Sequence, residues 1–174
     1  PFVIGHRGAC GHAPENTLSS IRQGAALGLE WIEFDAMLSA DDQIILYHDD
    51  DLRRITGIDG LTAETSFEVL RTLDAGSWFS KSFSGEKIPT LKEAFALLKT
   101  LWLGAVVEIK PTEGRGRETG ALVSAAVRDR WPASLPTPII SSFNEDALAQ
   151  ARDLAPDIPR ALNLYKSLDG WQDK

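Results

Sequence analysis

Two acidic residues stand two positions apart in a run that is otherwise apolar. Glu33 and Asp35 belong to the stretch from Trp31 to Leu38, whose composition is typical of a buried β-strand. Because side chains alternate between the two faces of a strand, both carboxylates leave the same face, with Cα atoms about 7 Å apart. Buried carboxylates must be paired, hydrogen-bonded or bound to metal. This pair is close enough to share a cation.

A histidine follows the next apolar run. The run from Ile44 to Tyr47 is joined to the first by a polar turn and ends at His48 and Asp49. Imidazole titrates near neutral pH and can move protons. The two runs have the spacing of a hairpin, but we interpret them as two adjacent barrel strands, with His48 at the C-terminal end of the second. Asp49 begins a run of three acids that is typical of a solvated segment, although Asp49 could orient His48.

The elements that must position these groups alternate along the chain. Strand-like runs centre near residues 3, 34, 46, 107, 140 and 162. Helical patterns begin after Asn16 or Thr17 and at residues 90, 119 and 144, whereas residues 52–88 lose clear periodicity except for a short helix at 68–73. This alternation predicts an α/β fold with a parallel sheet, open or closed as a barrel.

Polar residues recur at the C-terminal ends of the predicted strands. In a parallel barrel these ends share one rim, which is where barrel enzymes build their sites. We therefore expect three carboxylates, two histidines and two cations to converge. The residues are His6, Arg7, Glu33, Asp35, His48, Glu108 and Lys110, and more weakly Asn144.

Composition limits the classes of partner. The 174 residues suffice for one domain, and a formal net charge of -7 argues against nucleic acid or an anionic membrane as the main partner. The single cysteine, Cys10, excludes a disulfide framework and a multi-cysteine metal site, so we expect a reducing, cytoplasmic location. The chain begins at Pro1 without Met, which leaves a removed leader open. No apolar run approaches the length of a membrane span.

Taken together, the motifs resemble one known family. In order, they are His6-Arg7-Gly8, Pro14-Glu15-Asn16-Thr17, Glu33-x-Asp35, Leu73-Asp74-Ala75-Gly76-Ser77-Trp78-Phe79, Ile88-Pro89-Thr90-Leu91 and Glu108-Ile109-Lys110, with His48-Asp49 after the second strand. Each motif is weak alone, but their order and spacing over residues 4 to about 144 resemble the glycerophosphodiester phosphodiesterase family.

This resemblance implies a fold, a reaction and a set of roles. The fold is a TIM (β/α)8 barrel, here one domain over residues 1–174 with a small insertion subdomain at about 52–88. The reaction is the hydrolysis of glycerophosphodiesters to sn-glycerol 3-phosphate and an alcohol, with a divalent cation. The resemblance assigns His6 and His48 to acid–base catalysis, Glu33, Asp35 and Glu108 to the metal, and Arg7 and Lys110 to the phosphate.

Elementary chemistry agrees with these roles. A phosphodiester is attacked only when charge on its non-bridging oxygens is neutralised, and a hard cation held by oxygen ligands supplies this neutralisation. Three carboxylates without a usable thiolate suit Mg²⁺ or Ca²⁺ better than zinc. Two histidines on opposite sides of phosphorus can act as base and acid. The attacking oxygen, the glycerol 2-hydroxyl or water, stays open, as do the alcohol, the metal and the oligomeric state.

Several residues have a plain structural alternative. Glu15 and Asn16 have the pattern of loop and cap residues, with a smaller chance of orienting a site residue, and His12 is interpreted as structural or supporting. Lys110 could form an ordinary ion pair. Trp78 and Phe79 are typical of a small local core, or of a wall against the leaving alcohol.

The sequence departs from the family pattern at its end. A TIM barrel has eight strands and commonly about 250 residues, and the last two strand–helix units have no counterpart after Leu164. Three explanations are open: an incomplete chain, a segment around Tyr165 to Lys174 joined from a longer chain, or a broken barrel. We favour the incomplete chain, because an open barrel would expose apolar strand edges. The alternatives to this function are a related phospholipase or phosphodiesterase with another head group, and a non-catalytic phosphodiester-binding module.

Overall fold

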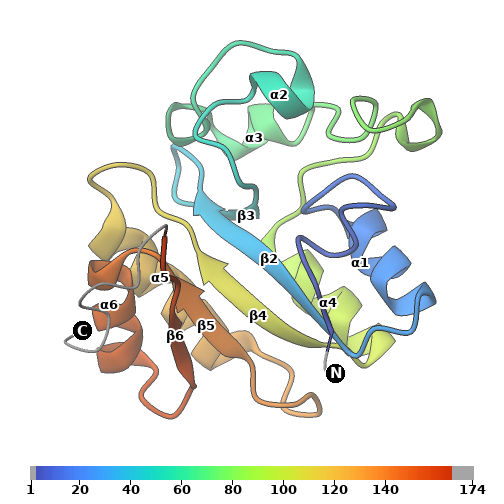
Figure 1. Cartoon of the computed structure of the whole chain (residues 1–174). Helices are drawn as coiled ribbons and strands as arrows, with labels where there is room; N and C mark the ends of the chain where they lie inside the picture. Colours follow the sequence, from blue (N-terminus) through green and yellow to red (C-terminus); the bar gives the residue numbers. More distant parts are fainter. Residues whose placement is uncertain (1–2, 166–174) are drawn as a thin grey trace.

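A computed structural model describes residues 3–165 of the chain. Its centre is a parallel sheet with the strand order β1-β2-β4-β5-β6, which confirms the predicted α/β class (Figure 1). Each parallel pair is joined through a helix, as parallel pairing requires. The strands are β1 (Ile4–Gly5), β2 (Trp31–Leu38), β4 (Gly104–Ile109), β5 (Ile139–Ser142) and β6 (Arg160–Leu162).

Four longer helices connect these strands. Three of them begin at the predicted polar caps: the side chains of Thr17, Thr90 and Asn144 each accept a hydrogen bond from a backbone N–H of the first turn. The fourth helix begins at residue 116, three residues before the predicted start. The helices are α1 (Leu18–Ala26), α4 (Leu91–Leu101), α5 (Gly116–Arg130) and α6 (Glu145–Leu154).

The second apolar run does not become a barrel strand. It forms β3 (Ile44–Leu46), which pairs antiparallel with residues 36–38 of β2 and lies off the main strand path. The prediction of two adjacent barrel strands is therefore wrong. A five-residue turn allows a hairpin, whereas a parallel pair needs a crossover of a dozen or more residues. The parallel neighbours of β2 are β1 and β4, and the described residues contain five parallel strands rather than six.

Alternation along β2 separates the main core from the predicted site. Ile32, Phe34 and Ala36 are fully buried in an apolar cluster that includes side chains of α1, α4, α5 and α6. Because neighbouring side chains point to opposite faces, Glu33 and Asp35 project from the other face of the sheet. The helices thus hold the strand by one face and leave the acids on the other.

Residues 52–88 form several short turns of helix above the C-terminal end of β2 (Figure 1). They have a small apolar cluster of their own, which Met37 and Tyr47 join from the β2–β3 region. The insertion subdomain at about 52–88 and its boundaries stay a prediction. The short elements are α2 (Arg53–Thr56), η1 (Thr62–Glu64), α3 (Phe67–Leu70), where a helix at 68–73 is predicted, and η2 (Lys81–Phe83).

No helix within residues 3–165 is long and apolar enough to cross a bilayer.

Candidate active site

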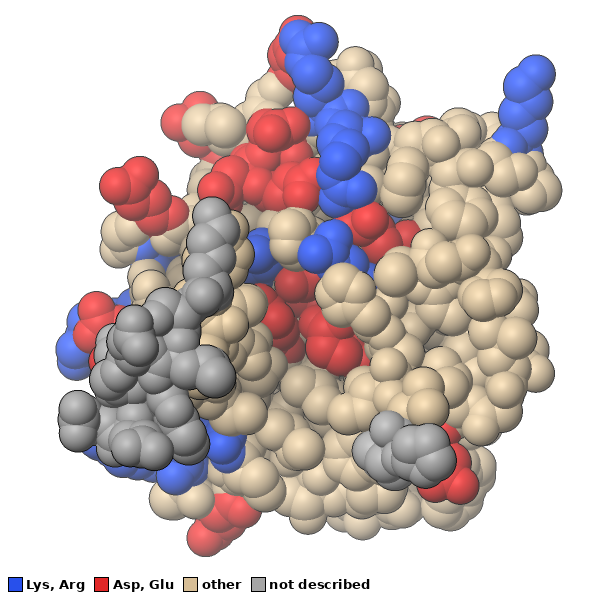
Figure 2. Space-filling model, in the orientation of Figure 1, with Lys and Arg blue, Asp and Glu red and all other residues tan. Residues whose placement is uncertain are grey.

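Three carboxylates from two neighbouring strands meet at the C-terminal end of the sheet. One oxygen each of Glu33, Asp35 and Glu108 lies within 4.8 Å of the other two. The register explains this meeting, because Asp35 of β2 stands beside Glu108 of β4. Figure 2 shows acidic side chains gathered near the centre of this face with basic side chains beside them.

Neighbouring groups fix the orientation of each carboxylate. The Asn16 amide donates to Asp35 Oδ2 at 2.8 Å and accepts from the Asp35 backbone N–H at 3.1 Å. The Arg7 backbone N–H donates to Glu33 Oε2 at 2.8 Å, and Asn163 donates to Glu108 Oε2 at 3.0 Å. Such supporting contacts are typical of metal-ligating carboxylates, whose geometry they fix in advance.

The electrostatics of this cluster favour a cation. Burial and then the nearby Asp35 raise the pKa of Glu33 to about 8, and the same two causes raise the pKa of Glu108. Glu33 Oε1 is buried without a hydrogen-bond partner. A hard divalent cation would pair this oxygen and neutralise the repulsion, so the residues fit such an ion.

His6 lies at the edge of the acidic cluster. Its Nε2 is 3.9 Å from Glu33 Oε2, its Nδ1 is 3.8 Å from the Cys10 sulfur, and its side chain is 64% exposed. Partial burial and then the neighbouring Arg7 lower its pKa, which favours the neutral imidazole. A neutral, accessible imidazole can accept a proton, as a general base must.

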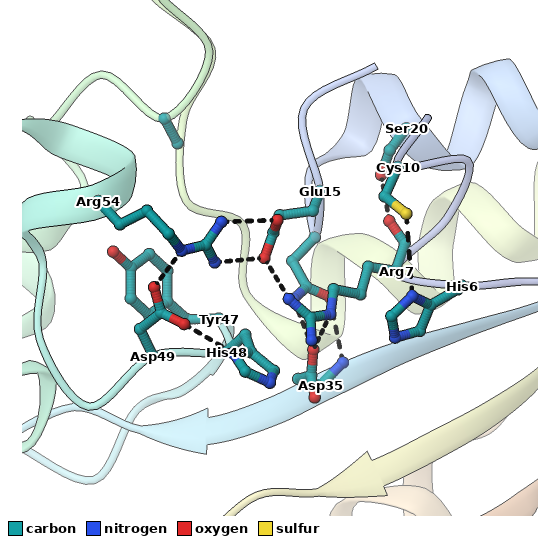
Figure 3. A network of polar contacts seen from close by, with 12 residues as sticks. His6, Arg7, Cys10, Glu15, Ser20, Asp35, Tyr47, His48, Asp49 and Arg54 are labelled. Carbon is teal, nitrogen blue, oxygen red and sulfur yellow. Dashed lines mark hydrogen bonds and ion pairs between the residues drawn. The ribbon is translucent and has the colours of Figure 1, made fainter. Parts of the chain in front are cut away.

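His48 lies on the other side of the Arg7–Asp35 pair from His6 (Figure 3). Its Nδ1 is 2.7 Å from Asp49 Oδ1. The carboxylate can only accept, so Nδ1 carries the proton and Nε2 is left for chemistry. Asp49 is therefore not a solvated acid but the partner of His48.

Arg7 is held above the carboxylates by an unusual backbone. Its φ is 49°, in the left-handed region that non-glycine residues seldom adopt. Its Nη1 donates to Glu15 Oε1 at 2.6 Å, and its Nε lies 3.4 Å from Asp35 Oδ2 without a hydrogen bond. An unsatisfied buried donor at this place could bind an anionic oxygen.

Lys110 follows β4 and lines an open depression of about 250 Å³ with Glu108 and Asn144. Within residues 3–165 it makes no direct ion pair with a carboxylate, although its charge opposes part of the rise in the Glu108 pKa. Its ammonium is therefore available to an anion bound in this depression.

Sequence reasoning underrated the residues that support these groups. Asn16 orients Asp35 while Thr17 caps α1, and Glu15 accepts from both Arg7 and Arg54. The sequence motifs assign no role to Arg54 or Asn163. The motif Pro14-Glu15-Asn16-Thr17 is the sequence signal for Glu15 and Asn16. Contacts between residues as far apart as Asn163 and Glu108, which are separated by 55 positions, cannot be predicted without the fold. His12, by contrast, is exposed, and its interpretation as a structural or supporting residue stays a prediction.

Comparison with known proteins adds an independent finding. A family model described as the glycerophosphoryl diester phosphodiesterase family matches residues 6–173. The Bacillus subtilis protein YhdW is 36% identical over 166 residues, which are 92% of this chain and 65% of YhdW. A glycerophosphodiester phosphodiesterase of Caldanaerobacter subterraneus is 31% identical over 171 residues, 95% of this chain and 67% of that protein. The chain thus spans about two thirds of the length of these relatives.

Solved structures of phosphodiesterases also resemble this chain. An Oleispira antarctica phosphodiesterase in complex with the product sn-glycerol-3-phosphate superposes with a TM-score of 0.94 at 42% identity, covering 99% of this chain and 70% of that one. A glycerophosphodiester phosphodiesterase from Agrobacterium tumefaciens gives a TM-score of 0.74 at 30% identity, covering 89% and 63%. The fold is that of the TIM barrel, to which the described residues contribute five parallel strands.

Proposed function

Since the chain belongs to the glycerophosphoryl diester phosphodiesterase family, we propose that it hydrolyses glycerophosphodiesters to sn-glycerol 3-phosphate and an alcohol with the help of a divalent cation. The observation that carries this proposal is the convergence of Glu33, Asp35 and Glu108 to within 4.8 Å beside two histidines. The product-bound Oleispira phosphodiesterase supports the substrate class.

We propose that these three carboxylates hold Mg²⁺ or Ca²⁺. All available ligand atoms are oxygens, which both ions prefer. When bound, the ion would neutralise charge on the non-bridging phosphate oxygens. The unpartnered Glu33 Oε1 and the mutual repulsion of the carboxylates support this assignment without deciding between the two metals.

In the proposed reaction the phosphate is bound by two cations of the chain. Arg7 offers the buried Nε that lacks a hydrogen bond, and Lys110 approaches from the depression beside β4. Both groups are charge-assisted donors, which bind phosphate oxygens strongly. A chain of formal net charge -7 needs such local cations to hold an anionic substrate.

The two histidines would then exchange protons with the attacking and leaving oxygens. One imidazole takes the proton of the attacking hydroxyl as its oxygen bonds to phosphorus, and the other protonates the departing alkoxide as the P–O bond breaks. His48 has its Nδ1 engaged by Asp49, so Nε2 is its reacting atom. A cytoplasmic location and a role in lipid and glycerol metabolism stay predictions.

Release of sn-glycerol 3-phosphate from glycerophosphocholine tests the proposal. We expect activity with Mg²⁺ or Ca²⁺ and its complete loss in excess EDTA, with recovery when the ion is restored. His48→Ala should abolish turnover and leave ion binding intact. Full activity in excess chelator would overturn the metal assignment, and release of phosphocholine in place of sn-glycerol 3-phosphate would overturn the cleavage site.

A further inference from the structure

Arg54 joins three segments of the chain at one guanidinium group. Arg54 lies on α2 of the inserted segment, and its Nη1 and Nη2 donate to Glu15 at 2.9 and 2.7 Å. Its Nε donates to Asp49 Oδ2 at 2.6 Å. Glu15 belongs to the loop between β1 and α1, and Asp49 to the segment after β3. Figure 3 shows the guanidinium between the two carboxylates.

Each of the two carboxylates also touches a residue of the proposed machinery. Asp49 Oδ1 accepts from His48 Nδ1 at 2.7 Å, and Glu15 Oε1 accepts from Arg7 Nη1 at 2.6 Å. One continuous chain of hydrogen bonds therefore runs from His48 through Arg54 to Arg7. The proposed proton-transfer group and the proposed phosphate-binding group are thus fixed by the same side chain.

The charges along this chain match the role of a fixed anchor. Although burial opposes ionisation of both acids, hydrogen bonds from Arg54 lower the pKa of Glu15 and of Asp49 below their usual ranges. Both carboxylates stay ionised and keep accepting hydrogen bonds. A guanidinium can serve the two at once because its donors form a planar fork, which the single ammonium of lysine lacks.

Trp78 supports the guanidinium from the inserted segment. The Arg54 guanidinium carbon lies 5.5 Å from the centre of the Trp78 ring, within the range of a cation–π contact. The indole N–H donates to the Ala75 carbonyl at 2.9 Å, which fixes the ring. The neighbouring Arg53 makes none of these contacts: its side chain is 71% exposed and pairs with Asp59 at the surface.

We infer that Arg54 is a positioning residue of this active site, which holds His48 through Asp49 and Arg7 through Glu15. Through Arg54, the inserted segment then helps to orient residues of the active site and does not only cover it. This inference rests on the proposed function for the roles of His48 and Arg7. The orientation of His48 can nevertheless be measured without activity.

The first experiment reads the tautomer of His48 by ¹⁵N NMR of the histidine rings, at about pH 8, where most imidazoles are neutral. The chain has three histidines, and His48→Gln assigns the signal. We expect a single tautomer with the proton on Nδ1 in the wild type and in Arg53→Met, and a mixture in Arg54→Met. An unchanged His48 signal in Arg54→Met would overturn the inference, even if the wild type proved inactive on every phosphodiester tested.

The second experiment separates the two branches by kinetics on glycerophosphocholine. Asp49→Asn should lower kcat about 10- to 100-fold with little change in KM, as loss of an orienting partner commonly does. Glu15→Gln should raise KM with a smaller effect on kcat. Arg54→Met should show both changes and Arg54→Lys an intermediate loss, while Arg53→Met keeps wild-type values.

Thermal unfolding separates positioning from a purely structural role. If Arg54→Met lowers only the melting temperature and keeps wild-type kcat and KM below that temperature, Arg54 merely ties the inserted segment to the barrel and the inference fails. Wild-type protein without phosphodiesterase activity would instead count against the proposed function, and the ¹⁵N signal would still decide the orientation of His48.

Discussion

Asn16 and Asp35 hold one another by two hydrogen bonds. The Asn16 amide donates to Asp35 Oδ2 at 2.8 Å, and its carbonyl accepts from the Asp35 backbone N–H at 3.1 Å. Asn16 adopts a φ of 55°, a left-handed conformation that its short polar side chain tolerates. The loop after β1 thereby fixes a carboxylate on β2, and this relationship leads to the first prediction.

Asn16→Ala should weaken divalent-ion binding about 10- to 100-fold, as removal of a group that orients a ligand commonly does. Asp35 would lose the partner that fixes its direction. Titration of Mg²⁺ and Ca²⁺ by calorimetry measures the effect. Arg22→Met, an exposed change on α1, serves as the control. Equal affinity in wild type and Asn16→Ala would show that the pair is unrelated to ion binding.

The metal-free protein should lose stability as the pH rises from 4.5 to about 8. Glu33 has a folded pKa of about 8, above its ordinary value of 4.5. Between these values the folded state binds more protons than the unfolded state, so raising the pH favours unfolding. Melting temperatures in EDTA at several pH values measure this loss.

Added Mg²⁺ or Ca²⁺ should reverse that loss, with an increment in melting temperature that grows toward pH 8, because the ion competes with the proton for Glu33. Glu33→Gln should reduce both the loss of stability with pH in EDTA and the response to the ion, and the raised pKa of Glu108 accounts for the pH dependence that remains. Glu30→Gln, which changes an exposed acid, should leave both intact. If the ion raised the melting temperature by the same amount at every pH, the prediction would be wrong.

Gly8→Ala should destabilise the protein by about 1–3 kcal/mol. Gly8 has a φ of 83°, and a Cβ atom there would come within 2.3 Å of Ser20 Oγ and 2.8 Å of the Ser20 backbone carbon. Gly11→Ala in the same loop is the matched control, since its Cβ would meet nothing within 4 Å. Urea unfolding of both variants gives the comparison, and equal free energies of unfolding would contradict it.

Arg71 and Glu93 should stabilise the protein at neutral pH and cease to do so in acid. Both guanidinium Nη atoms of Arg71 donate to Glu93 at 2.6 Å, and this hydrogen bonding lowers the Glu93 pKa to about 2. The stabilisation is present above the unfolded value of 4.5 and is lost as the pH falls through 2.

Arg71→Met should therefore cost about 1 kcal/mol or less at pH 7, because the pair is partly exposed. Its unfolding free energy should approach that of the wild type near pH 2. Urea unfolding at several pH values tests this convergence. A constant difference down to pH 2 would mean that the loss comes from packing and not from the ion pair.

Lys110→Met should weaken binding of sn-glycerol 3-phosphate about tenfold or more, the expected loss for one charge-assisted hydrogen bond. Calorimetric titration of the wild type, Lys110→Met and a control, Lys92→Met, measures this affinity. Lys92→Met, which removes an exposed lysine of α4, should bind as the wild type does. Unchanged affinity in Lys110→Met would remove this residue from the proposed phosphate site.

The sequence by itself determined the elements of this protein and most of its polar site residues. Hydrophobic periodicity located the strands and the longer helices, because local burial imposes the periods of 2 and 3.6. The Glu33-x-Asp35 spacing determined that both acids leave one face of a strand. The family motifs then predicted Glu108 as the third member of the cluster, and its oxygen lies within 4.8 Å of the others.

Only the tertiary structure decided how those elements pair and what supports the site. Whether a strand pairs parallel or antiparallel depends on the strand beside it, and the local sequence does not record this. β3 therefore has the sequence of a barrel strand but pairs antiparallel with β2 as a hairpin. Arg54 meets Glu15 across 39 residues and Asn163 meets Glu108 across 55. Contacts of this kind leave no local pattern, because their partners become neighbours only when the sheet has formed.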